Sequence, residues 1–151
     1  MPSVLTLSAS ELRAVMAAKF PFAYGLVLDT DYNVPTPEAV DVFRKELGAL
    51  LLEYYGDKWQ SFYDCENFGL EAMTLACRKH WVARYAGGGS AQGVAWGLLG
   101  YKTDPSDANT GHAVSVWIDA EKNVHVFEPQ NRTDLILTDD QCASAFFYFF
   151  S

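Results

Sequence analysis

One helix constrains the fold of this chain more than any other sequence feature. It begins at Thr36-Pro37-Glu38, where a hydroxyl side chain precedes a proline and an acid, the residue types that favour a helix start. Apolar residues then recur at helical spacing as far as Gly56; they are Val40, Phe43, Leu47, Leu50, Leu51 and Tyr54. Such a stripe has to be buried against another element, and a chain that is 50% hydrophobic and 20% charged has the composition of a globular protein.

The remaining segments divide into helices toward the N-terminus and strands toward the C-terminus. A short helix is predicted over 8–19, where Ser8 and Glu11 have capping-box spacing, and a third helix over 64–80. The predicted strands are 24–28, 94–101, 112–118, 124–128, 135–138 and 145–150. This order predicts an α+β domain in which N-terminal helices pack on a C-terminal antiparallel sheet. The length fits a single domain over residues 1–151.

Charge and cysteine content limit the partners and the cellular location. The formal net charge is −8 and no Lys/Arg cluster occurs, which argues against nucleic acid as a partner. No basic and apolar leader is visible, and no apolar stretch reaches membrane-spanning length. Three cysteines cannot all pair within one chain. We therefore expect a cytoplasmic protein without a membrane partner.

Cys65, at the start of the third predicted helix, is the candidate nucleophile. A thiol reacts as thiolate, and the positive end of a helix lowers the pKa of a thiol placed there. An imidazole beside the thiol takes its proton, and a third group orients the imidazole. The narrow side of this helix, made of Cys65, Gly69, Ala72 and Ala76, is expected to face the sheet.

His112 and Glu128 are the candidates for the base and its orienting partner. They lie on the two strands of a predicted hairpin that turns near residues 120–121. A three-residue loop places them opposite each other and a five-residue loop places them diagonally, on one face in both cases. A four-residue loop would put them on opposite faces. The valines that share their face are expected to pack against the narrow side of the Cys65 helix.

Three strings in this order resemble a family of phage and bacterial papain-like (transglutaminase-like) cysteine peptidases. They are Asp64-Cys65-Glu66-Asn67-Phe68, Gly111-His112-Ala113 and Phe127-Glu128-Pro129-Gln130. The catalytic domain of the fairy-ring mushroom agglutinin looks like a distant relative. The resemblance implies a papain-like fold with Cys65 as nucleophile, His112 as general base and Glu128 as orienting residue. Family members usually carry a second acid and then Phe-Ala after the cysteine, so Glu66-Asn67-Phe68-Gly69 is a departure.

An oxyanion hole is the remaining requirement of this chemistry. Papain-like enzymes use a glutamine shortly before the cysteine, and Gln60 lies five residues before Cys65. Gln130, at the far end of the hairpin, competes for the role. No metal site is expected, because the histidines and cysteines lack zinc spacing and the aspartates are too scattered for calcium.

The predicted function is a cysteine hydrolase or acyltransferase that acts on amide bonds, and a peptidase (thiol protease) above all. The expected partner is a protein or peptide substrate, no cofactor is expected, and the location becomes the host cytoplasm if the protein is phage-encoded. The alternative is a catalytically inactive papain-like phage or bacterial protein that binds a host or virion partner. A third possibility is a structural domain that assembles through its aromatic C-terminus.

Overall fold

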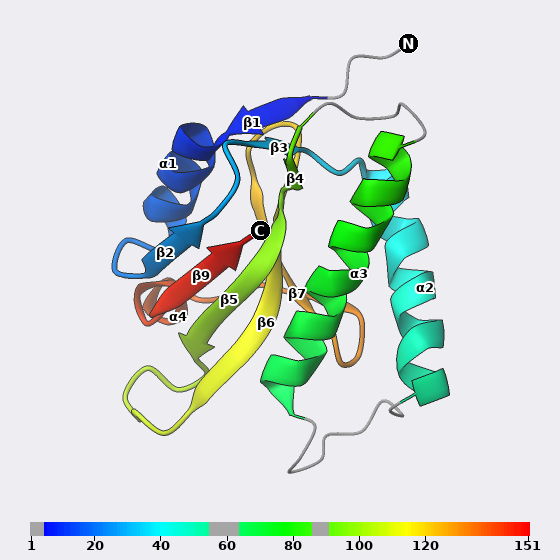
Figure 1. Ribbon diagram of the computed structural model, residues 1–151. Helices are drawn as coiled ribbons and strands as arrows, with labels where there is room; N and C mark the ends of the chain where they lie inside the picture. Colours follow the sequence, from blue (N-terminus) through cyan, green and yellow to red (C-terminus); the bar gives the residue numbers. More distant parts are fainter. Residues whose placement is uncertain (1–4, 55–63, 86–90) are drawn as a thin grey trace.

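Two β-sheets form the framework of the computed structural model, which describes residues 5–54, 64–85 and 91–151 (Figure 1). The described strands form a three-stranded sheet in the order β1-β3-β4 and a six-stranded sheet in the order β2-β9-β5-β6-β7-β8. The strands are β1 (Thr6–Ser8), β2 (Tyr24–Val27), β3 (Asp31–Asn33), β4 (Gly93–Val94), β5 (Trp96–Lys102), β6 (Gly111–Ile118), β7 (Val124–Glu128), β8 (Thr133–Leu135) and β9 (Phe147–Phe150).

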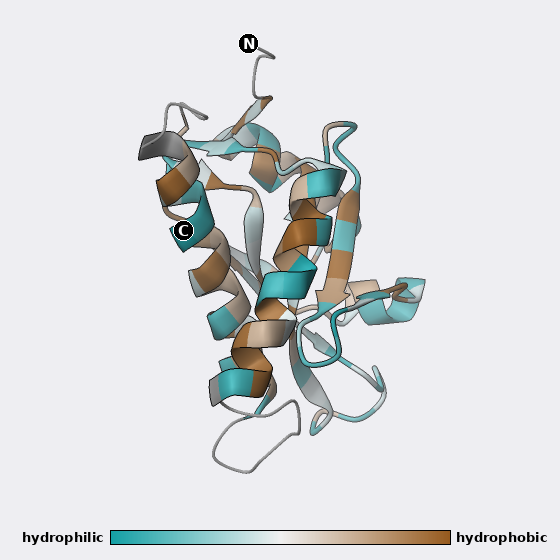
Figure 2. Ribbon diagram, turned by 90° about the vertical axis from the view of Figure 1, so that its right-hand side faces the viewer, coloured by the Kyte–Doolittle hydropathy of each residue, from teal (hydrophilic) through white to brown (hydrophobic). Residues whose placement is uncertain are grey.

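Helices cover both faces of the larger sheet (Figure 1). Helix α1 (Ala9–Lys19) lies on one side, where Leu12 and Met16 are buried in the same cluster as Val114 and Val116 of β6. Helices α2 (Pro37–Tyr54) and α3 (Cys65–Tyr85) lie on the other side. Figure 2, which looks onto that side, shows brown and teal bands alternating along both helices, as expected of amphipathic helices with one buried face.

The predicted architecture of N-terminal helices on a C-terminal antiparallel sheet is wrong. Residues before α2 supply β1, β2 and β3, and the pairings β2–β9 and β3–β4 are parallel. Strands β1 and β3 have three residues each, which is too short for period-two alternation to reveal them. Parallel pairing of β2 with β9 joins segments from the two ends of the chain, and no local sequence pattern reports such a pairing.

The ends of several elements also differ from expectation. Helix α3 continues to Tyr85 instead of ending near residue 80. The predicted strand over 135–138 is wrong, because β8 ends at Leu135 and Thr138 is the N-cap of the short helix α4 (Asp139–Ala143). The side chain of Thr138 accepts a hydrogen bond from the Gln141 backbone in a capping box, so this hydroxyl starts a helix instead of ending a strand.

The loop between β6 and β7 has five residues, which is one of the two lengths predicted to place His112 and Glu128 on the same face. Ser115 pairs with Phe127 and Ile118 with Val124, so residues 119–123 form the connection. The expectation that the valines of this hairpin face α3 is wrong, since Val114 and Val116 pack with α1. Trp117 and Phe127, from the other face, pack with α3. Both faces are apolar, and alternation alone cannot tell which of two buried faces meets which helix.

The small side of α3 does lie close to the sheet. A Cβ atom on Gly69 would come within 2.3 Å of Leu98 Cδ1, and Ala72 and Ala76 are buried in the cluster that contains Trp117 and Phe127. Small side chains therefore let the helix backbone approach β5 and β6 closely, as their spacing predicted.

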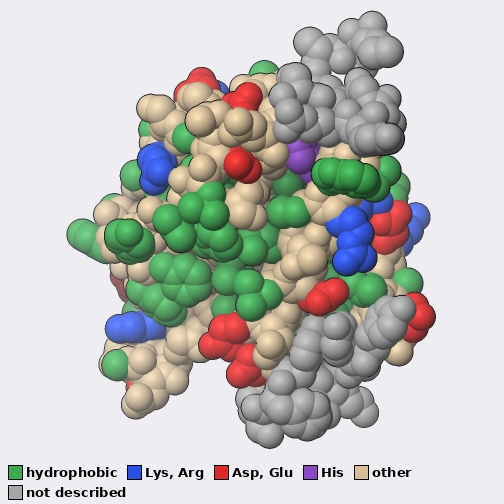
Figure 3. All heavy atoms as spheres, in the orientation of Figure 1, with side chains coloured by type: hydrophobic (Ala, Val, Ile, Leu, Met, Phe, Trp, Pro, Cys, Tyr) green, Lys and Arg blue, Asp and Glu red, His purple; other side chains and the backbone are tan. Residues whose placement is uncertain are grey.

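Strand β2 is an edge of the six-stranded sheet and exposes apolar side chains. Phe22, Tyr24, Leu26 and Leu28 are all exposed, and hydrophobic side chains gather over β2 and β9 in Figure 3. The guanidinium group of Arg13 donates hydrogen bonds to the carbonyl oxygens of Gly25 (3.4 Å) and Val27 (3.1 Å). These bonds occupy carbonyl groups that another strand would use, so the edge is protected against pairing.

Two glycines test how closely the elements approach each other. A Cβ atom on Gly97 in β5 would lie 2.4 Å from the backbone oxygen of Phe149. We expect Gly97→Ala to lower the free energy of unfolding by about 1–3 kcal/mol, because a backbone strand has to move. Gly48→Ala in α2 is the matched control, since its Cβ meets only the Arg132 side chain, at 3.3 Å. The control should gain about 0.5–1 kcal/mol from helix propensity. Urea unfolding measures both, and equal effects would contradict the close approach.

Candidate functional site

Cys65 is the first residue of α3. The helix start is held by the Asp64 backbone N–H, which donates to Asn67 Oδ1 at 3.1 Å, and by Phe68 N–H, which donates to the Asp64 carbonyl at 3.1 Å. The thiol is half-buried and free of disulfide bonds. Cys65 therefore lies in the first turn, where the unpaired amide groups of a helix favour negative charge.

His112 and Glu128 are in direct contact across the hairpin. The Nε2 atom of His112 lies 2.6 Å from Glu128 Oε2. The Glu128 side chain is 12% exposed, and its other oxygen accepts a hydrogen bond from the Gln130 backbone at 3.2 Å. In the five-residue register the two residues are diagonal neighbours, and the observed contact agrees with that geometry. Glu128 thereby fixes the orientation of the imidazole ring.

The Cys65 side chain interacts with the same imidazole. Two hydrogen bonds raise the pKa of His112 to about 10. The bond with Cys65 has the largest effect, and the bond with Glu128 has the next largest. Cys65 also packs against a small apolar cluster that contains Ala113, the neighbour of His112 in β6. Because Nε2 is bonded to Glu128, the ring nitrogen left for the thiol is Nδ1. A protonated imidazole in this position stabilises a thiolate.

Glu66 joins this cluster, although the sequence alone did not reveal its role. The Cys65 thiol donates to Glu66 Oε2 at 3.3 Å. A hydrogen bond from Asp64 is the main cause that lowers the pKa of Glu66, and the same bond raises the pKa of Asp64. The thiol therefore has two possible partners, a carboxylate on its own helix and the imidazole. The sequence does place an acid, Glu66, directly after the cysteine. The residues around it depart from the family pattern, so the sequence assigned this acid no role.

The two candidate oxyanion residues have different outcomes. Gln60 lies outside the described residues. Gln130 follows β7, where its N–H donates to Glu128 and its carbonyl accepts from Arg132 at 2.9 Å. A role for Gln130 in stabilising an oxyanion stays a prediction. Within the described ranges, no group of three or more His, Cys, Asp and Glu side chains could hold a metal ion, and no helix is long and apolar enough to cross a membrane.

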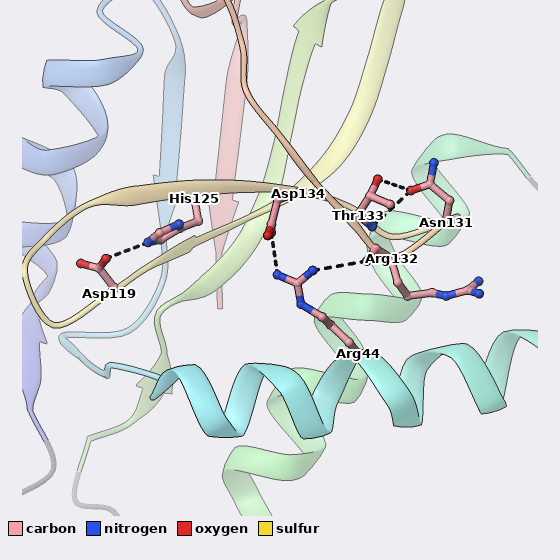
Figure 4. Close-up of polar contacts among 7 residues, drawn as sticks. All are labelled: Arg44, Asp119, His125, Asn131, Arg132, Thr133 and Asp134. Carbon is pink, nitrogen blue, oxygen red and sulfur yellow. Dashed lines mark hydrogen bonds and ion pairs between the residues drawn. The ribbon is translucent and has the colours of Figure 1, made fainter.

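A second histidine–carboxylate pair lies elsewhere on the hairpin (Figure 4). His125 Nε2 is 2.7 Å from Asp119 Oδ2, and its ring stacks on Trp117 with 4.1 Å between centroids. His125 faces away from Glu128, as its odd position in the hairpin predicted. Figure 4 also shows Arg44 of α2 bonded to Asp134 of β8. These contacts hold the hairpin and α2 in place and contain no thiol.

Comparisons with known proteins identify the fold. No family model and no curated protein matches the chain. Chains of solved structures do match, among them PSL1a in complex with E64, and Polyporus squamosus lectin bound to the human-type influenza-binding epitope Neu5Aca2-6Galb1-4GlcNAc. The TM-scores are 0.70 and 0.68, each at 19% identity over 97% of this chain. The chain spans about half of these solved chains, 51% and 50%.

This finding corrects the predicted family, fold and function. The structures that share the fold are of a lectin, so the predictions of a phage or bacterial papain-like (transglutaminase-like) family and of a papain-like fold are wrong. The prediction of a peptidase, thiol protease or acyltransferase is corrected with them. Three strings of three to five residues describe the surroundings of single side chains, and such local matches specify neither the fold nor the reaction of the whole chain.

The raised pKa of His112 can be tested by replacing its carboxylate partner. Glu128→Gln removes the negative charge and the charged hydrogen bond, so the pKa of His112 should fall below its value of about 10. An NMR titration of the His112 ring signals from pH 5 to 11 measures the change. Glu121→Gln, which removes an exposed carboxylate from the hairpin loop, should leave the titration unaltered. A wild-type midpoint near the ordinary value of about 6.5 would contradict the described cluster.

Proposed function

We propose that this protein is a binding domain whose ligand is a glycan. The observation that carries the proposal is the fold, which is similar over 97% of this chain to half of a lectin solved with a sialylated trisaccharide. This similarity favours the alternative drawn from the sequence, a protein that binds a partner, over a cysteine hydrolase or acyltransferase. Glycan binding is a proposal for this chain, because the similarity covers half of the lectin and fold does not determine function.

The Cys65–His112–Glu128 cluster is the site that we propose for the ligand. Binding sites combine a largely preformed surface with a few convergent polar groups, and this cluster is the place where a thiol, an imidazole and two carboxylates converge. The His112 side chain is 24% exposed, and its raised pKa keeps it cationic at neutral pH. The carboxylate of a sialic acid would share this cation with Glu128, which already pairs with His112 Nε2 at 2.6 Å.

Calorimetric titration with two sugars tests this proposal. Neu5Aca2-6Galb1-4GlcNAc should bind with a Kd of roughly 1 mM or tighter. The same sugar without sialic acid should bind about fivefold more weakly, the effect of about 1 kcal/mol for a partly exposed charge pair. His112→Gln should remove this difference, whereas the control His125→Gln, on another part of the hairpin, should retain it.

Two outcomes would contradict this reading in different ways. Absence of binding to either sugar would exclude glycan binding by this domain. Binding that His112→Gln leaves unaltered would retain the glycan as ligand but exclude the cluster as its site.

We also propose that Cys65 is a nucleophilic thiol, with His112 as its base and Glu128 as the residue that orients His112. The specific observation that favours this second property is the position of the Cys65 thiol at a helix N-terminus beside the His112–Glu128 pair, where thiol and carboxylate together raise the pKa of the imidazole. An imidazolium and a helix dipole both stabilise a thiolate. Such a thiolate adds to a carbon electrophile in one step, in which the sulfur forms the new bond and the leaving group departs.

Site-resolved alkylation measures this reactivity. With iodoacetamide at pH 7, mass spectrometry should find Cys65 modified about tenfold faster than Cys77 or Cys142, because an ordinary thiol is only a few per cent ionised there. Burial raises the pKa of Cys142, so that residue should be the slowest.

A matched variant separates activation from mere exposure. His112→Gln should reduce the rate at Cys65 to that of the other thiols, and Glu121→Gln should have no effect. Equal rates at all three cysteines of the wild-type protein would exclude an activated thiol.

Two further predictions concern the chain as a whole. A single domain over residues 1–151 and a cytoplasmic location stay predictions, which composition and the number of cysteines support. Neither affects the placement of the cluster.

A further inference from the structure

A second candidate site lies beside the last turns of α3, close to β4 (Figure 1). A cavity of about 270 Å³ opens there, and its lining includes side chains of α3, the strand β4 and the residues that precede β3 and β4. This volume is below the roughly 300–1,000 Å³ of pockets that hold drug-sized molecules, so it suits a ligand of about one ring. Trp81 lies 16 residues after Cys65 on α3, roughly 24 Å at the helical rise, so the cavity is separate from the Cys65 cluster.

Trp81 supplies an accessible aromatic surface to this cavity. The residue is 64% exposed, so a ligand can reach the indole ring from solvent. Its neighbour in the lining, His80, has a fixed ring, because Nε2 lies 3.2 Å from the Ala91 carbonyl oxygen. A rigid aromatic side chain offers a large contact area at a low cost in conformational entropy. An indole face packs on apolar C–H groups or on a cation, so the polar groups of the lining have to distinguish these two kinds of ligand.

Asp29 is the hydrogen-bond acceptor of the lining. Its residue is half-buried, and no side chain or backbone group within the described ranges donates a hydrogen bond to its carboxylate. The Oδ2 atom lies against Gly93 of β4, where a Cβ atom would come within 2.7 Å of it. The glycine therefore leaves room for the carboxylate on the wall of the cavity. An ionised carboxylate only accepts hydrogen bonds, so this one requires a donor on the ligand.

Gln92 is the hydrogen-bond donor of the lining, and its amide has a fixed orientation. Its Oε1 atom accepts hydrogen bonds from the backbone N–H of Thr30 at 3.3 Å and from the Thr30 hydroxyl at 3.1 Å. Because Gln92 is exposed, its amino group Nε2 stays available as a donor. The described residues that line the cavity include no Lys or Arg, so the lining does not favour an anion.

We propose that this cavity binds one ring of a neutral saccharide. The C–H face of the sugar packs on Trp81, one hydroxyl donates a hydrogen bond to Asp29, and a neighbouring hydroxyl accepts one from Gln92 Nε2. Each hydroxyl can donate and accept, so a pair of hydroxyls satisfies a carboxylate and an amino group together. An ammonium group would satisfy Asp29 but offers no acceptor to Gln92. The proposal does not rest on the Cys65 cluster as a glycan site.

Three neutral sugars and one amine test the chemistry of the ligand. The sugars are the methyl β-glycosides of glucose, galactose and N-acetylglucosamine, and the amine is butylammonium. We expect at least one glycoside to bind with a Kd of roughly 10 mM or tighter and to shift the Trp81 indole N–H signal in a ¹H–¹⁵N spectrum. Trp81→Phe assigns that signal among the four indoles. Absence of binding by all three glycosides, or tighter binding of butylammonium than of every glycoside, would overturn the proposal.

Gln92→Glu separates a sugar from a cation at the same site. The variant retains an oxygen that accepts from Thr30 and replaces the donor Nε2 by a second acceptor. The affinity for the glycoside should therefore fall about fivefold, the effect of one lost hydrogen bond, whereas any affinity for butylammonium should rise. Glycoside affinity that is unaltered or raised in this variant would contradict the proposed hydrogen bond.

Two further variants locate the sugar. Trp81→Ala and Asp29→Asn should each weaken glycoside binding at least about threefold, and neither removes a fully buried side chain. The matched controls are Phe22→Ala, which removes an aromatic ring that is 76% exposed, and Glu121→Gln, which removes an exposed carboxylate. Both controls and His112→Gln should bind as the wild type does. Full affinity in both Trp81→Ala and Asp29→Asn, or a loss of affinity in His112→Gln alone, would overturn the proposal.

Discussion

The five-residue loop between β6 and β7 is the constraint on which the rest of the candidate site depends. One carboxylate closes it: Asp119 Oδ1 accepts hydrogen bonds from the backbone N–H groups of Glu121 at 2.9 Å and Asn123 at 2.8 Å. Lys122 adopts a left-handed backbone with φ of 65°, as a tight connection of this kind requires. A connection one residue shorter or longer would move His112 and Glu128 to opposite faces of the hairpin. The register of one hairpin thus decides whether the imidazole has its carboxylate.

Helices pack on both faces of the β6–β7 hairpin, and this packing restricts the position of His112. Valines on one face pack with α1, while Trp117 and Phe127 on the other pack with the small side of α3. Because Gly69 and the alanines of α3 allow a close approach, the helix start brings Cys65 to the end of the sheet where His112 lies. The thiol then interacts with an imidazole on one side and with Glu66 on the other.

Helix α3 also separates two regions of different chemistry. Its first turn carries polar and ionisable groups that converge on a thiol, and its last turns border an apolar cavity. The fold is shared with half of the Polyporus squamosus lectin chain at 19% identity, a level at which the backbone is retained while most side chains differ. The chemistry of the two regions therefore follows from the side chains of this chain and not from the shared fold.

The amino-acid sequence by itself determined the local features of this protein. It specified the starts of α1 and α2, the β7 strand, the small side of α3 and the even parity of His112 and Glu128, because caps and side-chain periodicity are properties of neighbouring residues. It did not reveal β1 or β3, the parallel pairing of β2 with β9, or the strand end at Leu135, since these depend on partners distant in sequence. The choice between a three- and a five-residue loop, and the face of the hairpin that meets α3, were likewise decided only by the tertiary structure. Both faces of that hairpin are apolar, so the physical preference for burial is the same for each, and only the packing of α1 and α3 distinguishes them.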